Sequence, residues 1–262
     1  MTNWKELVEE LNELVKLDSG IIACKRMAKK DGYMDIPGIE KPHKGFLYCQ
    51  LPYLVRKQGK TIGVTKEDFE AYADKTQLKY RCVRIQGLAP ADEKELDSEA
   101  KGFAGFWFKD YDTAMEQMKI YPAPTPIEAL VMSPLEEEKF EPDYIMIYAD
   151  GEQMTFILNG LQYHKYELIE SCFIGEGSCA DALPRSAATK KPSLSLPCLG
   201  ERNFGLAGKE ELILTIPPDR LERIVEGLKA LKENGLAYPA TPLEPAVNAG
   251  EMLQQLYPLQ DS

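Results

Sequence analysis

The sequence has little histidine, no closely spaced cysteine pair and no long apolar run, and each absence narrows the possible functions. Only His43 and His164 occur among its 262 residues, so a Ser–His–Asp or Cys–His triad has few ways to form. No apolar run approaches the roughly 20 residues that span a bilayer, and we expect no membrane partner. The first 18 residues place acids among the apolar positions, unlike a signal or transit peptide, so a cytoplasmic location is expected.

Positive charge is also in short supply. The chain has 31 lysines and arginines against 42 aspartates and glutamates, a formal charge of −11. Nucleic-acid binding needs a cationic surface that displaces counterions from phosphates, so we expect no nucleic-acid partner. The same charge disfavours docking on anionic lipid. A small-molecule ligand or substrate is the expected partner, and association into a homo-oligomer stays open.

The cysteines are scattered, without CxxC or CxxxC spacing. They are Cys24, Cys49, Cys82, Cys172, Cys179 and Cys198. A disulfide framework is not expected, and some of these residues should be buried as small hydrophobes. Zinc and iron–sulfur sites usually show closely spaced pairs, so no metal site is predicted. The dinucleotide fingerprint is absent as well, and the identity of any cofactor stays open.

Alternating helical and strand patterns predict an α/β fold, a mixed β-sheet with helices packed on its faces. We expect strands over residues 20–24, 61–64, 103–108, 128–132, 144–148, 168–174, 194–197 and 212–216. We expect helices over 3–17, 46–58, 66–74, 151–163 and 250–256, after Asp110 or Asp112, from Ser178 and after Pro218. Residues 29–45 should form a loop. The acidic segment 89–101 should be solvated surface.

The first candidate site follows the predicted strand that ends at Ile174. Ser178 and Asp181 have the spacing of a Ser-x-x-acid helix cap, which would place Cys179 at the first helical position. Free amides there favour anions and lower the pKa of a thiol. We therefore expect a reactive or ligand-contacting Cys179, with Glu176 and Ser178 beside the ligand. The alternative is a tight turn whose small residues only allow close packing.

The second candidate site follows the strand that ends at Pro197. Cys198 lies at the strand exit, and Gly200 should form a turn that presents Glu201 and Arg202. Loops after strand ends are where sites concentrate in α/β sheets, and Arg202 could hold a carboxylate or phosphate. The alternative for Arg202 is a surface ion pair.

A third segment, 121–128, is stiffened by three prolines. Its hydroxyl groups, on Tyr121 and Thr125, could line a pocket at little entropic cost. A rigid connector between a helix and a strand is the alternative, and it is the simpler interpretation.

Four segments together resemble one family: YPAPTPIEALVMSPL from Tyr121, PDYIMIY from Pro142, GSCADA from Gly177 with SLSLPCLGER from Ser193, and ELILTIPPDRLERIVEG from Glu211. They are similar to the domain-of-unknown-function 169 (DUF169, ArCR-like) proteins. The resemblance covers about residues 103–235; residues 1–100 diverge more, and 236–262 form a proline-rich tail. It implies a single α/β domain over 1–262, a cytoplasmic setting and an anaerobic host. It implies no established activity.

Two functions follow as hypotheses. The first is an enzyme, a hydrolase or lyase, that acts on a small polar or anionic metabolite. In it Cys179 is nucleophile or ligand, Asp181 or Glu176 moves protons, Arg202 holds an anionic group, and Cys198 completes the site. The second is a non-catalytic small-ligand or cofactor-binding protein, or an accessory subunit.

Overall fold

A computed structural model describes residues 2–70, 78–89, 93–175, 177–242 and 248–256. In these residues a seven-stranded mixed sheet forms the centre of the fold, in the order β2-β3-β4-β1-β5-β7-β6. The strands are β1 (Ile22–Met27), β2 (Ile39–Glu40), β3 (Thr61–Thr65), β4 (Ala129–Pro134), β5 (Tyr144–Ala149), β6 (Ser193–Ser195) and β7 (Leu212–Ile216). Strands β2 and β3 run parallel, and the other neighbours pair antiparallel. The predicted α/β class is confirmed.

Both faces of the sheet are covered, which explains why its middle strands are apolar throughout. All six residues of β5 are buried. Successive side chains of a strand point to opposite faces. Ile145 and Ile147 accordingly belong to one hydrophobic core, whereas Tyr144, Met146 and Tyr148 belong to another.

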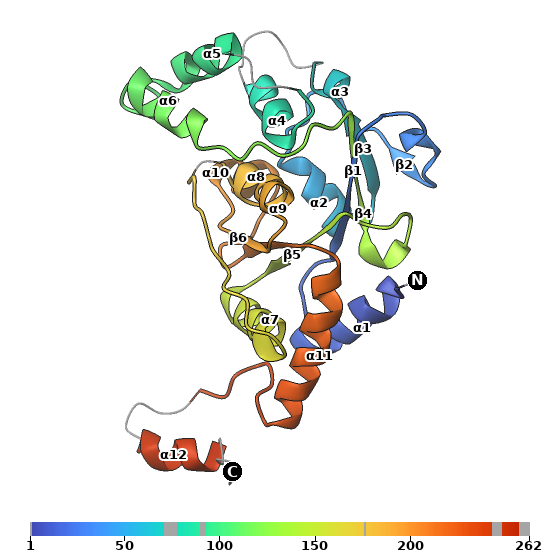
Figure 1. The fold of residues 1–262 in the computed structure, drawn as a ribbon, viewed down its shortest axis with the longest axis vertical. Coiled ribbons are helices and arrows are strands. Elements are labelled where there is room, and N and C mark those ends of the chain that lie inside the picture. The colour runs from blue at the N-terminus through green and yellow to red at the C-terminus, as the bar shows by residue number, and fades with distance from the viewer. Residues whose placement is uncertain (1, 71–77, 90–92, 176, 243–247, 257–262) are drawn as a thin grey trace.

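Three helices cover the first face: α1 (Trp4–Val15), α7 (Gly151–Tyr163) and α11 (Asp219–Glu233). Asn3 accepts a hydrogen bond from the amide of Glu6, and Asp150 forms a capping box with Gln153, so α1 and α7 begin where polar caps stand. Figure 1 shows these helices together on one side of the sheet.

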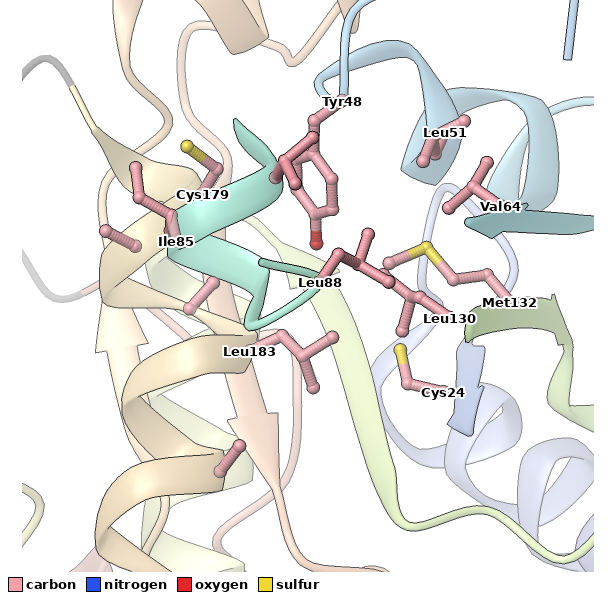
Figure 2. Close-up of a cluster of buried hydrophobic side chains, with 14 of the residues drawn as sticks. Cys24, Tyr48, Leu51, Val64, Ile85, Leu88, Leu130, Met132, Cys179 and Leu183 are labelled. Atoms are coloured by element: carbon pink, nitrogen blue, oxygen red, sulfur yellow. The ribbon is translucent and has the colours of Figure 1, made fainter. Parts of the chain in front are cut away.

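The second face carries shorter helices and is the side where the candidate site lies. They are α2 (Gln50–Arg56), α3 (Lys66–Glu70), α4 (Leu78–Gln86), α8 (Ser178–Asp181), α9 (Leu183–Thr189) and α10 (Leu199–Phe204). Two more helices, α5 (Glu93–Phe103) and α6 (Tyr111–Lys119), extend outward beyond α4 as a helical lobe (Figure 1). Figure 2 shows the core beneath, in which Leu88 lies next to the sheet residue Leu130, and Ile85 lies near Cys179 on the opposite side.

The remaining elements are the 3₁₀ turns η1 (Tyr33–Asp35) and η2 (Leu135–Glu137) and the helix α12 (Ala249–Leu256). The predicted loop 29–45 therefore contains η1 and the short strand β2. The predicted helix 66–74 is described only as far as residue 70, and the rest of it lies outside the described residues. In the part of the chain that the structure describes, no helix is long and apolar enough to cross a membrane.

Three local predictions are wrong. Residues 103–108 are not a strand: α5 ends at Phe103, and a turn follows in which Gly105 adopts a φ of 74°. Residues 168–174 are not a strand either, because they share only a single bridge, Ser171 with Leu194. The segment 89–101 is not all solvated surface, since it forms most of α5 and buries Glu99 completely.

Candidate functional site

A cavity of about 320 Å³ lies where α4, α5 and α10 meet. Its wall is mainly apolar, with Leu47, Phe103, Phe106, Trp107, Leu199 and Phe204. Four cysteines line the same cavity: Cys49, Cys82, Cys179 and Cys198. Arg81 supplies a cation and Asn203 an amide. The cavity therefore joins a thiol cluster to an apolar binding surface.

Cys198 has the most unusual environment of the four cysteines. It directly precedes α10 and is 4% exposed. A hydrogen bond from the Cys49 thiol lowers the pKa of Cys198 to about 5; burial opposes the shift, and the Ser178 hydroxyl and the amides of Ser178 and Glu201 favour it. The same contact raises the pKa of Cys49. The hydrogen bond therefore favours ionisation of Cys198 over ionisation of Cys49.

Glu201 lies one helical turn after Cys198 and is 2% exposed. The Tyr148 hydroxyl donates to its Oε1 at 2.6 Å, and the Ser178 hydroxyl lies 3.1 Å from its Oε2. Burial raises the pKa of Glu201 to about 7, although both hydroxyl contacts oppose the shift. The Arg56 guanidinium stacks on the Tyr148 ring at 4.2 Å, below this group.

Ser178 connects the two titrating groups, because its hydroxyl contacts both the Cys198 sulfur and the Glu201 carboxyl. A hydroxyl has one hydrogen to donate, so it points to only one of them at a time. With its hydrogen on Glu201 Oε2, as in the structure, the Ser178 hydroxyl favours an ionised Glu201. Turned toward the Cys198 sulfur, the same hydrogen favours a thiolate there and a protonated Glu201.

The other cavity groups are less reactive or serve to bind. Burial raises the pKa of Cys82 to about 11. Cys179 is 8% exposed, and its carbonyl accepts a hydrogen bond from Gln86 at 3.0 Å. Arg81 hydrogen-bonds the Tyr121 hydroxyl and stacks on the Phe103 ring at 4.9 Å, which holds its charge at the apolar wall.

The predicted cap at Ser178 and Asp181 is wrong. Gly177 precedes α8 and Ser178 is its first residue, so Cys179 is the second. The Asp181 carboxylate instead accepts a hydrogen bond from the Ile174 amide at 2.7 Å, while the Ser178 hydroxyl is engaged by Glu201. Burial raises the pKa of Asp181 to about 6. Both side chains hold the fold together at this turn and are almost fully buried.

The structure brings Cys179 and Cys198 together at one cavity and places Ser178 against Cys198, whereas Asp181, Arg202, Tyr121 and Thr125 are not among the described residues that line the cavity. Arg202 donates to the carbonyls of Gly208 at 2.6 Å and Lys209 at 3.4 Å, and it is not among the described residues that line the cavity. The predicted turn at Gly200 is the start of α10, which buries Glu201 and does not present it.

Tyr121 lies behind Arg81 and donates from its hydroxyl to Gln117 at 3.1 Å. Thr125 is exposed, and its carbonyl accepts a hydrogen bond from Arg26 at 2.8 Å. Glu176 lies outside the described residues. Within the described ranges, no three His, Cys, Asp or Glu side chains are placed to hold one metal ion.

Sequence reasoning missed Cys49, Cys82, Arg81 and Glu201 as site residues. A signal existed for Glu201 alone, since it stands three residues after Cys198 and would share a helical turn with it. Cys49, Arg81 and Cys82 reach the cavity only through the packing of α2 and α4 against α10.

Comparison with known proteins identifies the family of this chain. The model of the DUF169 family, described as uncharacterised ArCR, matches residues 10–227 and so includes every described residue that lines the cavity. An uncharacterised protein of Methanocaldococcus jannaschii is 26% identical over 232 residues, which cover 87% of this chain and 95% of the relative. No solved structure matches the chain. The chain belongs to the DUF169 family.

Proposed function

We propose that the chain is a thiol-dependent hydrolase that acts on a small metabolite with an apolar body and one anionic group. The observation that carries this proposal is the position of Cys198 at the wall of the cavity, where Cys49, Ser178 and two backbone amides hydrogen-bond its sulfur and lower its pKa to about 5. A thiolate is the nucleophilic form of cysteine, and here it forms without a neighbouring histidine.

The cavity wall supports the choice of substrate. Aromatic and aliphatic side chains remove the apolar body of a ligand from water, and few polar groups fix its orientation. Arg81 places a guanidinium on the same wall, where low exposure strengthens attraction to a carboxylate or phosphate. The size, about 320 Å³, suits a small metabolite and excludes a folded macromolecule.

The reaction would use one proton, which Glu201 holds near the Cys198 sulfur. Cys198 attacks the acyl carbon of an ester or thioester, and the protonated Glu201, through Ser178, supplies a proton to the leaving group. The ionised Glu201 then takes a proton from the water that cleaves the acyl-enzyme. Acid and base are the same group in the two halves of the reaction.

A panel of 4-nitrophenyl esters, with apolar acyl chains that end in a methyl or a carboxylate group, tests this proposal. We expect the carboxylate-ended esters to be cleaved fastest. Cys198→Ser should lower turnover by about two orders of magnitude or more, because the hydroxyl stays protonated. Cys172→Ser is the matched control, since Cys172 is not among the described residues of the wall. Equal turnover by Cys198→Ser and the wild type would remove the hydrolase proposal.

A non-catalytic ligand-binding protein is the second candidate, and the largely apolar wall favours it. Trp107 lines the cavity and is 39% exposed, whereas Trp4 is buried beyond the sheet. Binding of long-chain carboxylates should therefore quench Trp107 fluorescence in the wild type and leave Trp107→Phe unchanged. Quenching without turnover of any ester assigns the binding function.

A further inference from the structure

Two of the cavity cysteines lie within reach of each other although α2 and α10 are far apart in the chain. The thiol of Cys49 hydrogen-bonds the sulfur of Cys198. A Cβ added at Gly200 would lie 3.3 Å from the Cys49 sulfur and 3.7 Å from the Cys198 sulfur, so the glycine leaves the space that both sulfurs share. Both residues also line the cavity.

The backbone holds the two residues in this position. Gly205, at the end of α10, packs so closely on the Cys49 carbonyl that a Cβ there would lie 2.3 Å from the carbonyl oxygen. The start of α2 therefore rests directly on α10. A disulfide needs sulfurs that approach without a large backbone movement, and this packing supplies that approach.

We propose that Cys49 and Cys198 are a redox-active dithiol that reduces low-molecular-weight disulfides entering the cavity and itself closes to an intramolecular disulfide. The apolar wall and the cation of Arg81 select disulfides with an aromatic or aliphatic body and a carboxylate. This activity goes beyond the hydrolase proposal and does not depend on it.

The reaction balances in two steps. The Cys198 thiolate bonds to one sulfur of the disulfide RSSR, the S–S bond breaks, and RS⁻ leaves and takes a proton from solvent. Cys49 then loses its proton and bonds to the Cys198 sulfur, which expels a second RS⁻ that is protonated to RSH. In sum, the protein dithiol loses two electrons and RSSR gains them to become two RSH. A dithiol reductant restores the starting state.

The order of attack follows from the hydrogen bond between the two sulfurs. Cys198 is the thiolate and attacks first, while its charge keeps the proton on Cys49. Once Cys198 is part of a mixed disulfide, that charge is gone and Cys49 ionises more easily. The second step is thereby favoured only after the first.

The test uses 5,5′-dithiobis(2-nitrobenzoate), an aromatic disulfide with carboxylates, without oxygen, in a Cys172→Ser background that removes a half-buried thiol outside the cavity wall. The parent protein should release two thionitrobenzoates per chain in the fast phase and retain none. Cys49→Ser should release one and retain one. Cys198→Ser should lose the fast phase, with a rate at pH 6 about 100-fold lower or less.

Peptide mapping of the oxidised parent protein gives the decisive result and needs no cavity variant. A Cys49–Cys198 cross-link supports the proposal. Retention of a thionitrobenzoate adduct by the parent protein, or a cross-link to Cys82 or Cys179, overturns it. Ester turnover plays no part in this readout, so the dithiol and the hydrolase proposals stand or fall separately.

Discussion

Cys198 lines the cavity and Glu201 is buried one helical turn after it, and the pKa values of the two groups move in opposite directions. Burial raises the pKa of Glu201 from 4.5 to about 7. Hydrogen bonds lower the pKa of Cys198 from 9.0 to about 5. Between pH 5 and 7 the folded protein therefore binds an extra proton at Glu201 and lacks one at Cys198, relative to the unfolded chain. Their contributions to the pH dependence of stability oppose each other in that window.

Glu201→Gln should separate the two contributions. A carboxyl whose folded pKa is raised stabilises the fold at low pH, and this contribution is lost as pH rises from about 4.5 to about 7. The free energy of unfolding of the variant should therefore rise relative to the wild type across this window, by about 1 to 3 kcal/mol. Urea denaturation at several pH values measures the difference.

The exposed Glu210 provides the control for this prediction, and Glu210→Gln should leave the free energy of unfolding within about 0.5 kcal/mol of the wild type. A difference for Glu201→Gln that stays constant with pH would mean that Glu201 ionises as an ordinary carboxyl. The proton relay through Ser178 would then lose its acid.

At the scale of elements, α7 and α11 cross where Gly160 of one helix meets Gly227 of the other. A Cβ at Gly227 would lie 2.1 Å from the carbonyl oxygen of Gly160, and backbone cannot move aside as a flexible side chain can. Gly227→Ala should therefore destabilise the protein by about 2 kcal/mol or more, despite the better helix propensity of alanine.

Gly151→Ala, at the start of α7, is the matched control for this crossing, because nothing lies within 4 Å of its added Cβ. Chemical denaturation should show it as stable as the wild type. If Gly227→Ala were as stable as the wild type, the two helices could move apart without a loss in the free energy of unfolding.

The elements that sequence alone predicts are those with a strong period or a clear cap. The apolar run of β5, the spacing in α1 and a cap at Asp110 or Asp112 are local signals. The structure confirms all three and places the cap at Asp110, which accepts a hydrogen bond from the Thr113 amide at 3.0 Å. Helix α10 was not predicted because Gly200 resembles a turn residue. The glycine instead leaves room for the Cys49 sulfur, which would lie 3.3 Å from an added Cβ, and no local pattern contains that tertiary contact.

The site, like the fold, was predicted only where the signal is local. Cys179 and Cys198 follow predicted strands, and both reach the cavity. The predicted partners of Cys179 do not, because Asp181 binds the Ile174 amide and Arg202 binds two carbonyls on its own side of the loop. Cys49 and Arg81 come from distant segments, so only tertiary packing brings them to Cys198.

At the scale of the whole molecule, the cavity exists because the helical lobe stands opposite α10 (Figure 1). Phe103 ends α5, and Phe106 and Trp107 follow in the next turn. Beneath them, Arg84 of α4 donates to Glu99 of α5 at 2.6 Å, and both side chains are buried. This ion pair ties the lobe to the body of the molecule.

Glu99→Ala should loosen the lobe and the cavity together. Removal of one partner leaves the Arg84 charge buried without its carboxylate, which typically costs about 3–5 kcal/mol. Lys101→Ala is the control on the same helix, because its ion pair with Asp97 is exposed and contributes about 0–1 kcal/mol. Denaturation measures the first difference, and the fluorescence of Trp107 with a bound carboxylate measures the cavity. A Glu99→Ala protein that keeps both its stability and its ligand-dependent quenching would show that α5 is held by its apolar contacts alone.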